Sequence, residues 1–426
     1  MALATKIAQN SKPKTQNSKP LMGRRIELKI RSLLSAIVIG LWVAVLLGVC
    51  LRIGLNSHSH DVFVTYYDAG RKWIQSESLY SYTRGFVYSP LIAAFFVLFS
   101  WLPLSLGAVL WRLIDAAVFA GAIFWWLKAE IHDRIPKSSH WLVFLLILPL
   151  SLGNFNNGQI NPLIIGLLMI AILAARDRQW TLSAICLGIC AYLKIYPLSV
   201  GLLLVLIYPR KLGWRLVLTL ILMGALPFIL QRPAYVFEQY QRWFSFRAAD
   251  NRRMNMDIAP RDFAMILRML HINLSATVLL VIQILAGAAA AAVCMIGRVR
   301  KWSEERLLIC IFTLGTCWML LFGPATEDAT YAMIAPALSF AMVQAFSQTT
   351  PSWMRVLICV SYAVLLVGLI LNAFFGLKKT PYFMSVQPFG ALLFAGYTII
   401  WVFSSSLWKE ALGKRVGVSA YRGNGV

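Results

Sequence analysis

Long apolar stretches alternate with short polar connections along most of the chain. Thirteen such stretches lie near residues 33–55, 88–103, 105–127, 140–153, 160–175, 180–193, 197–208, 214–231, 273–297, 307–323, 331–347, 354–375 and 383–406. A helix that crosses a bilayer needs about 20 apolar residues, and several stretches have only roughly 12–16. The pattern predicts an all-α polytopic membrane protein with about 12 transmembrane helices, in which broken or half-length helices surround a cavity.

The basic residues predict how these segments are oriented. The chain has 40 Lys and Arg against 17 Asp and Glu, and the basic residues concentrate before the first span and in the connections near 176–178, 210–215 and 298–306. Cytoplasmic loops carry an excess of Lys and Arg, so both termini are expected on the cytoplasmic side of the inner (plasma) membrane. Thirteen crossings would separate the termini. One segment within 88–127, preferably Tyr88–Leu102, is therefore expected to enter the membrane without crossing it.

The same distribution divides the chain into three regions. A basic cytoplasmic tail over 1–32, expected to be disordered, precedes a transmembrane domain over 33–406 and a cytoplasmic tail over 407–426. With 59% hydrophobic residues, the composition excludes a soluble domain with a large core. The charges flank apolar segments, which argues against a nucleic-acid partner. All seven cysteines lie in apolar segments without metal-ligand spacing, and they are expected to be buried apolar side chains.

The first polar loop follows the first span and contains Asp61 and Asp68. The residues after Asp61 predict a short amphipathic helix in the membrane interface. Asp61 suits the N-cap of that helix, and Asp68 suits a solvated face. A carboxylate beside a membrane cavity can also remove a proton from a sugar hydroxyl that attacks an anomeric carbon, which makes Asp61 a candidate general base. His58 and His60 could ligate a metal, but chance easily produces their spacing, and no metal site is expected.

Three further polar tips are expected on the outer side. The Asn- and Gly-rich connection 153–162 is either a hairpin turn or the edge of a cavity lined by Gln159 and Asn161. Lys194 lies at the apex of a hairpin too short for two full spans. Its ammonium either extends to the headgroups or pairs with a lipid phosphate. Glu327, in the Gly-Pro tip 323–331, is a candidate site residue.

An arginine-rich loop from about Gln231 to His271 is also expected outside, against the positive-inside trend. Its arginines either pair with acids of the same loop and with lipid headgroups, or hold a phosphate through two parallel hydrogen bonds. Arg253 and Arg261 are candidates for the second role. A second interfacial helix is expected near 260–271.

Taken in order, these motifs resemble those of the polytopic glycosyltransferases of family 87, which include polyprenyl-phosphate-mannose-dependent mannosyltransferases. The matching residues are Asp61, Tyr66, Tyr67, Ala69, Leu79, Tyr80, Tyr88, Pro90, Gly158, Gln159, Asn161, Lys194, Tyr196, Pro197, Arg210 and Lys211. They extend over about the first half of the chain. The second half is similar in hydropathy and in its Gly-Pro tip. Some family members carry a histidine near this tip, where this chain has Glu327.

The resemblance implies a GT-C-type membrane fold and an inverting transfer on the extracytoplasmic face, with Asp61 as the base. It implies a polyprenyl-phosphate-linked sugar as donor, a hexose such as mannose, and a lipid or glycan as acceptor, with membrane lipids around the protein. Lys194 and loop arginines such as Arg253 and Arg261 would hold the phosphate. The other candidates for substrate contacts are Gln159, Asn161, Tyr88, Glu327 and Asp68. No metal cofactor is required, because the polyprenyl phosphate already carries its charge as it leaves.

A different class of protein also suits part of this pattern. Broken helices with charged midpoints are typical of transporters, so a transporter or flippase of a lipid-linked saccharide is the alternative function. An inverted repeat in hydropathy would favour the transporter, and none is evident in the sequence.

Overall fold

Helices form all the regular structure in the described part of the chain. The computed structural model describes residues 21–56, 61–80, 85–129, 131, 135–249, 252–324, 326–375, 380–404 and 407–408. Within these residues, nine helical segments are long and apolar enough to cross a membrane, and four further apolar helices are shorter. The prediction of an all-α polytopic membrane protein is confirmed.

The element bounds show how closely the helices follow the apolar stretches. The candidate spans contain α1 (Leu21–Leu55), α4 (Leu104–Lys128), η1 (Lys137–Ser139) with α5 (His140–Asn156), η2 (Pro209–Gly213) with α9 (Trp214–Ala225) and α10 (Pro227–Leu230), α13 (Ala276–Val299), α14 (Glu304–Phe322), η4 (Asp328–Ile334) with α15 (Ala335–Ser347), α16 (Ser352–Phe375), and α17 (Pro381–Met384) with α18 (Val386–Phe403). The shorter apolar helices are α3 (Pro90–Ser100), α6 (Asn161–Arg176), α7 (Trp180–Leu193) and α8 (Leu198–Ile207). The remaining elements are α2 (Phe63–Gln75), α11 (Pro233–Ala248), η3 (Arg252–Met254) and α12 (Phe263–Met269).

Helix α3 is the shorter of the two helices in the region expected to hold the non-crossing segment. It has 11 residues, whereas α4 has 25. At about 1.5 Å per residue, α3 covers roughly half of the hydrocarbon thickness. Helices α2 and α12 stand where the two interfacial helices were predicted. Helix α11 was not predicted, because its sequence is too polar to give an apolar signal.

The first helix corrects one expectation about the N-terminal region. Helix α1 begins at Leu21, so residues 21–32 of the predicted disordered tail are helical. The Met, Arg, Glu, Leu and Lys residues of this stretch are strong helix formers, and they extend the helix beyond its apolar part. Residues 1–20 and 409–426 lie outside the described residues.

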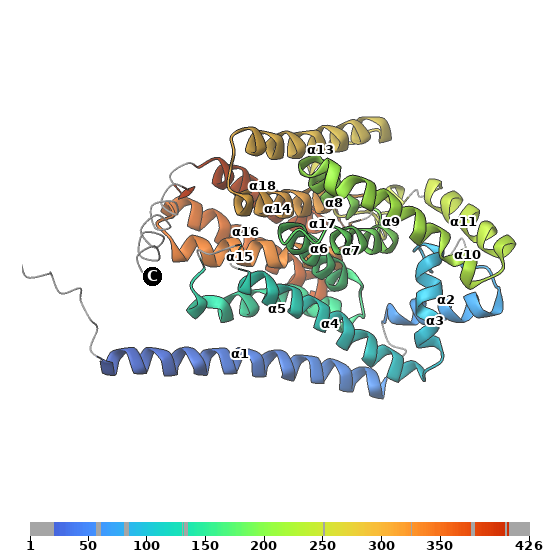
Figure 1. The fold of residues 1–426 in the computed structure, drawn as a ribbon, viewed down its shortest axis with the longest axis horizontal. Helices are drawn as coiled ribbons and strands as arrows, with labels where there is room; N and C mark the ends of the chain where they lie inside the picture. Colours follow the sequence, from blue (N-terminus) through green and yellow to red (C-terminus); the bar gives the residue numbers. More distant parts are fainter. Residues whose placement is uncertain are drawn as a thin grey trace, which may run out of the picture.

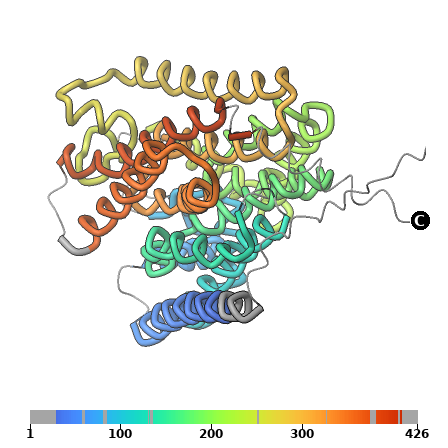
Figure 2. Tube along the Cα trace, turned by 90° about the vertical axis from the view of Figure 1, so that its left-hand side faces the viewer, coloured from blue at the N-terminus to red at the C-terminus, as the bar shows by residue number. Residues whose placement is uncertain are grey.

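Helix α1 lies along one side of the molecule and α13 along the opposite side (Figures 1 and 2). Both expose most of their residues, whereas α14 and α15 are almost entirely buried between them. Helices α2 and α3 cross near the end of the molecule at which α1 ends (Figure 1). They approach closely at Gly70, where a Cβ atom would lie 2.6 Å from the carbonyl oxygen of Phe96.

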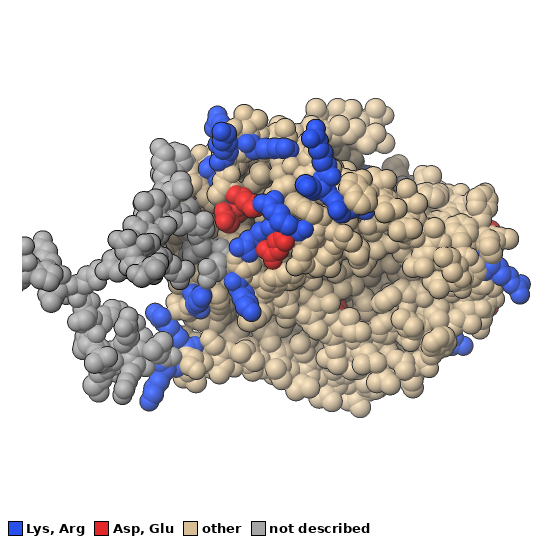
Figure 3. Space-filling view, viewed as in Figure 1, with Lys and Arg blue, Asp and Glu red and all other residues tan. Residues whose placement is uncertain are grey.

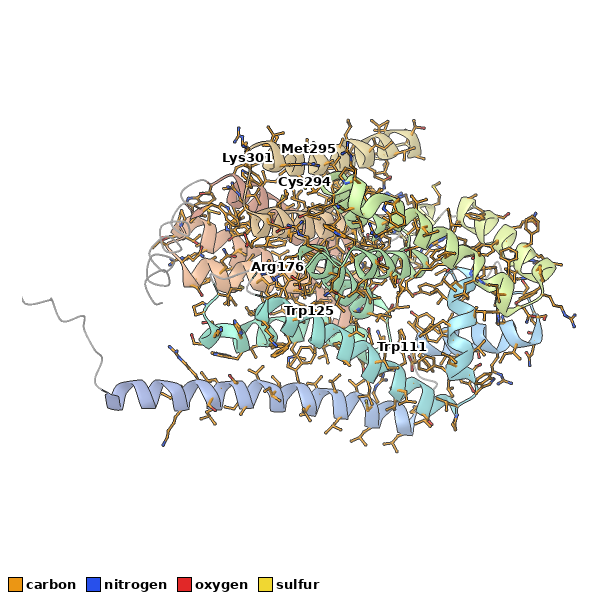
Figure 4. The ribbon with its side chains drawn as sticks, in the orientation of Figure 1. Trp111, Trp125, Arg176, Cys294, Met295 and Lys301 are labelled. Carbon is orange, nitrogen blue, oxygen red and sulfur yellow. The ribbon has the colours of Figure 1, made fainter. Side chains whose placement is uncertain are left out.

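The two ends of the molecule differ in charge. On the face shown in Figure 3, Lys and Arg side chains gather toward the end at which α1 begins. Arg176 and Lys301 lie nearer that end, and Trp111 of α4 lies nearer the other (Figure 4). This asymmetry is the one on which the expected orientation depends.

Candidate active site

Asp61 precedes α2, and its carboxylate forms a buried ion pair with Arg112 of α4. Its Oδ1 accepts hydrogen bonds from Arg112 Nη2 at 2.9 Å and from the backbone N–H of Phe63 at 3.0 Å. Neither charged side chain has exposed surface. The second oxygen, Oδ2, is also buried, and no hydrogen-bond partner is found for it in the described chain. Asp61 therefore accepts from the first backbone N–H of α2 and pairs with arginine through the same oxygen, which leaves Oδ2 free. The N-cap itself is Val62, so the N-cap position suggested for Asp61 is wrong by one residue.

The guanidinium of Arg112 is fixed by backbone carbonyls. It donates from Nη1 to Ala108 at 3.0 Å, from Nε to Phe155 at 2.8 Å and from Nη2 to Asn156 at 3.0 Å. Arg52, near the end of α1, donates to the same Asn156 oxygen at 2.7 Å. The C-terminus of α5 leaves carbonyls without helical partners and carries partial negative charge. Arg52 and Arg112 therefore donate hydrogen bonds to carbonyl oxygens at the C-terminus of α5, and Arg112 also pairs with Asp61.

The backbone carbonyls of the two residues after α5 also accept hydrogen bonds. The backbone N–H of Val62 donates to Asn157 O at 3.0 Å, and the indole N–H of Trp111 donates to Gly158 O at 3.0 Å. Four consecutive carbonyls, from 155 to 158, thus accept hydrogen bonds from residues near Asp61 or Arg112.

Gly158 is required by this turn. Its φ is +62°, in the left-handed region that favours glycine. A Cβ atom at this position would lie 2.7 Å from Asp61 Oδ1 and 3.1 Å from Arg112 Nη2. A side chain at position 158 would therefore strain the backbone and push against the ion pair.

The same connection, between α5 and α6, leads to Lys194. The Lys194 ammonium donates to Asn161 Oδ1 at 2.8 Å, and Asn161 Nδ2 donates to Asn154 Oδ1 at 2.9 Å. Both asparagines also donate to the carbonyl of Ala329, at 2.9 Å and 3.2 Å. Asn154 and Asn161 are buried, and Lys194 is half-buried. The tips predicted around Asn161, Lys194 and Glu327 therefore meet at one place, close to the turn that contacts Asp61.

A hydrogen bond joins the segment that holds Tyr88 to the segment that holds Lys194. Ser89 Oγ donates to the carbonyl of Tyr192 at 2.9 Å, which ties the start of α3 to the end of α7 just before Lys194. Burial raises the pKa of Tyr88, and the Lys194 ammonium opposes that rise. The charges that act on Tyr88 therefore include the lysine and, with the opposite sign, Glu327.

Glu327 is the exposed acid of this group. Its carboxylate caps η4 through the backbone N–H of Thr330, and it lies 3.7 Å from Arg252. Its side chain is 57% exposed. Burial raises the pKa of the neighbouring Tyr196, and the negative charge of Glu327 adds to that rise.

The other predicted site residues have different surroundings. Gln159 is half-buried in the turn, and its backbone N–H donates to Asn154 O at 2.9 Å. Asp68 is exposed on α2. Arg253 pairs with the buried Asp262, whose pKa is raised by burial while the guanidinium opposes the rise. Arg261 donates to the amide oxygens of Gln387 at 3.2 Å and Asn372 at 2.8 Å.

The structure thus brings together six predicted residues: Asp61, Tyr88, Gln159, Asn161, Lys194 and Glu327. The side chains of the other three, Asp68, Arg253 and Arg261, have different surroundings, although the backbone of Arg261 adjoins the Glu327 tip through hydrogen bonds to Thr326 and Tyr331. Sequence reasoning missed Arg52, Arg112 and Asn154. Arg112 had a usable signal, because an ionisable residue inside an apolar stretch suggests a function.

The described residues contain no group of three or more His, Cys, Asp or Glu side chains that could hold a metal ion. His58 and His60, the pair considered as metal ligands, lie outside these residues. The part of the site that can be described relies on lysine, arginine, amide and carboxylate groups.

Comparison with known proteins assigns the family. Residues 86–324 match the model of glycosyltransferase family 87. The chain belongs to glycosyltransferase family 87. The match includes Tyr88, Arg112, Asn161 and Lys194, and ends before Glu327. No curated protein matches the chain. The protein is therefore a multi-pass membrane glycosyltransferase.

Proposed function

We propose that this glycosyltransferase moves a hexose such as mannose from a polyprenyl-phosphate donor to a lipid or glycan acceptor, with inversion at the anomeric carbon. The observation that carries the proposal is the pair of groups joined by the connection between α5 and α6. At one end Asp61 has a fixed Oδ1 and an unpartnered Oδ2, and at the other Lys194 is held by Asn161.

Asp61 is the proposed general base. An acceptor hydroxyl oxygen forms a bond to the anomeric carbon as the bond from that carbon to the phosphate oxygen breaks. The hydroxyl proton passes to Asp61 Oδ2, and the electron pair of the broken bond leaves with the polyprenyl phosphate. Arg112 and the Phe63 N–H occupy Oδ1, so Oδ2 is the oxygen available to the proton. The side chain of Asp61 is fully covered, and neighbouring groups must move before an acceptor reaches it.

Lys194 is the proposed partner of the departing phosphate. Its ammonium has three N–H groups, and Asn161 takes one of them. The remaining N–H groups and the positive charge can stabilise the negative charge that develops on the phosphate as the glycosidic bond breaks. Asn161 and Gln159 are proposed to orient the lysine and to contact the sugar or phosphate.

The wider setting is also proposed. The basic end of the molecule would face the cytoplasm together with both termini, and the site would face the opposite side of the inner (plasma) membrane. The fold would be of the GT-C type, and membrane lipids would surround it. The donor needs no metal, because the leaving phosphate is already charged.

The test is a transfer assay with purified protein in vesicles. The wild type should move radiolabelled mannose from a polyprenyl-phosphate donor to a lipid or glycan fraction. Asp61→Asn should lower the rate at least about 100-fold, in the range of lost general-base catalysis, with unchanged expression. Glu238→Gln, which changes an exposed acid on α11 that belongs to none of these groups, is the matched control and should retain most activity.

The outcomes separate the alternatives. Full turnover in Asp61→Asn together with loss in Glu327→Gln would give the base role to Glu327. Movement of the lipid-linked sugar across the vesicle membrane without a new glycosidic bond would favour a transporter or flippase.

A further inference from the structure

The hydroxyls of Tyr66 and Tyr88 form a buried hydrogen bond of 3.0 Å. Tyr66 lies on α2 and has no exposed surface. Its ring stacks on Phe96 at 4.8 Å between centroids and meets Trp111 edge-on at 6.0 Å. This aromatic packing fixes the position of the Tyr66 hydroxyl.

Either hydroxyl of this pair could donate, and in both arrangements one proton has no acceptor among the described residues. Tyr66 has no exposed surface, whereas Tyr88 is 8% exposed, so an acceptor from outside the chain can reach only the Tyr88 proton. With such an acceptor bound, Tyr66 donates to Tyr88, and both protons have acceptors.

Tyr88 is left with its own proton to donate. Its backbone is fixed, because Tyr80 Oη donates to the Tyr88 carbonyl at 2.7 Å and Ser89 is tied to Tyr192. When Tyr66 donates, the described residues offer no acceptor for the Tyr88 proton. The Lys194 ammonium acts on the Tyr88 hydroxyl, and burial keeps that hydroxyl protonated by raising its pKa. The hydrogen bond from Ser89 to Tyr192 joins the two segments that carry this neutral O–H donor and the cationic N–H donor.

We propose that Tyr88 and Lys194 jointly donate hydrogen bonds to a phosphate group, and that Tyr66 is a positioning residue that turns the Tyr88 proton toward it. The ligand is an anion with several acceptor oxygens; an alcohol offers only one weak acceptor. Glu327 would oppose the anion, but Arg252 lies 3.7 Å from its carboxylate. The inference rests on the proposed function, because the phosphate meant here is that of the polyprenyl-phosphate donor.

The test measures binding and does not depend on turnover. Purified protein in detergent is titrated with decaprenyl phosphate, with decaprenol and with inorganic phosphate, and the dissociation constants are obtained from intrinsic tryptophan fluorescence. The wild type should bind decaprenyl phosphate more tightly than decaprenol. Tyr88→Phe should lower the affinity for decaprenyl phosphate by roughly tenfold or more, and Tyr66→Phe should lower it by roughly threefold to tenfold. Losses of this size are expected for hydrogen bonds to a charged group.

A matched control lies next to Tyr66 on the same helix. Tyr67 Oη donates to the carbonyl of Leu102 at 3.0 Å, away from Tyr88. Tyr67→Phe also removes one hydroxyl and one hydrogen bond from α2, and it should leave the preference for phosphate unchanged. If Tyr66 acts through Tyr88, then Tyr66→Phe should cause no further loss of affinity in a Tyr88→Phe background.

Each outcome bears on one claim. Wild-type affinity for decaprenyl phosphate in Tyr66→Phe, or equal losses in Tyr66→Phe and Tyr67→Phe, would overturn the role of Tyr66 and leave the proposed donor intact. A wild type that binds decaprenol as tightly as decaprenyl phosphate would remove the donor class itself. Binding of inorganic phosphate alone, lost in Tyr88→Phe, would retain the anion site but assign it to free phosphate.

Discussion

Oδ1 of Asp61 lies 2.9 Å from Nη2 of Arg112, and both side chains are closed to solvent. Removing two charges from water costs free energy that their attraction only partly returns. The pair is therefore a weak explanation of stability. Its clearer effect is on orientation, since it fixes one carboxylate oxygen and leaves the other open.

Loss of Arg112 is predicted to destabilise the fold. Arg112→Gln would leave the Asp61 carboxylate buried without its cation, at a cost of about 3–5 kcal/mol. The double variant Asp61→Asn with Arg112→Gln should lose less than the sum of the two single variants, because no buried charge remains. Thermal unfolding in detergent measures both effects.

The control for this prediction is the exposed Arg242–Glu238 pair, one helical turn apart on α11. Arg242→Gln should change stability by less than about 1 kcal/mol, as is usual for surface ion pairs. Equal losses in Arg112→Gln and Arg242→Gln would contradict a special role for the buried pair.

Gly158→Ala is predicted to disturb the site more than the fold. Alanine at φ +62° costs about 1–2 kcal/mol, and its Cβ would displace Asp61 or Arg112. Transfer activity should fall at least roughly tenfold, because small displacements of reacting groups are costly. Gly153→Ala is the control, since that glycine lies within α5 and a Cβ there would meet nothing within 4 Å. Unchanged activity in Gly158→Ala would argue against the turn as the support of Asp61.

Lys194→Gln is predicted to weaken use of the donor. It removes the cation and leaves Asn161 and Asn154 in place, so transfer at low donor concentration should fall by roughly tenfold or more. Initial rates across a range of donor concentrations measure the change. Lys301→Gln, an exposed lysine nearer the opposite end of the molecule, should have no effect. If the initial rate of Lys194→Gln depended on donor concentration as in the wild type, the lysine would be excluded as the phosphate ligand.

Alkaline pH is predicted to destabilise the protein through buried tyrosines. Burial raises the pKa of Tyr66 well above its ordinary value of 10. The folded state then holds this proton more tightly than the unfolded state. The resulting stability is fully present below about pH 10 and is lost as pH rises toward the folded-state pKa, by up to about 1.4 kcal/mol per pH unit.

Tyr66→Phe removes this titrating group. Melting temperatures recorded from about pH 8 to about pH 11 should fall less steeply in Tyr66→Phe than in the wild type. Parallel curves for the two proteins would show that Tyr66 does not contribute to the alkaline loss.

The sequence placed the helices well because hydropathy is a property of each segment alone. Each predicted apolar stretch contains a helix, and α3, with 11 residues, lies within the short stretch 88–103. Helix α11 was missed for the same reason, since its polar sequence carries no apolar signal. The extension of α1 to Leu21 was missed because charged residues suggested a tail, although many of them favour helix.

The sequence by itself determined an all-helical membrane protein and the polar tips that hold Asp61, Asn161, Lys194 and Glu327. Only the tertiary structure decided that Arg112, 51 residues from Asp61, is its partner, that Asp68 is exposed, and that Arg253 pairs with Asp262. The physical reason is the sequence separation over which each effect acts. Hydropathy and turn propensity act between neighbours along the chain, whereas a buried charge takes its partner from whichever helix packing brings beside it.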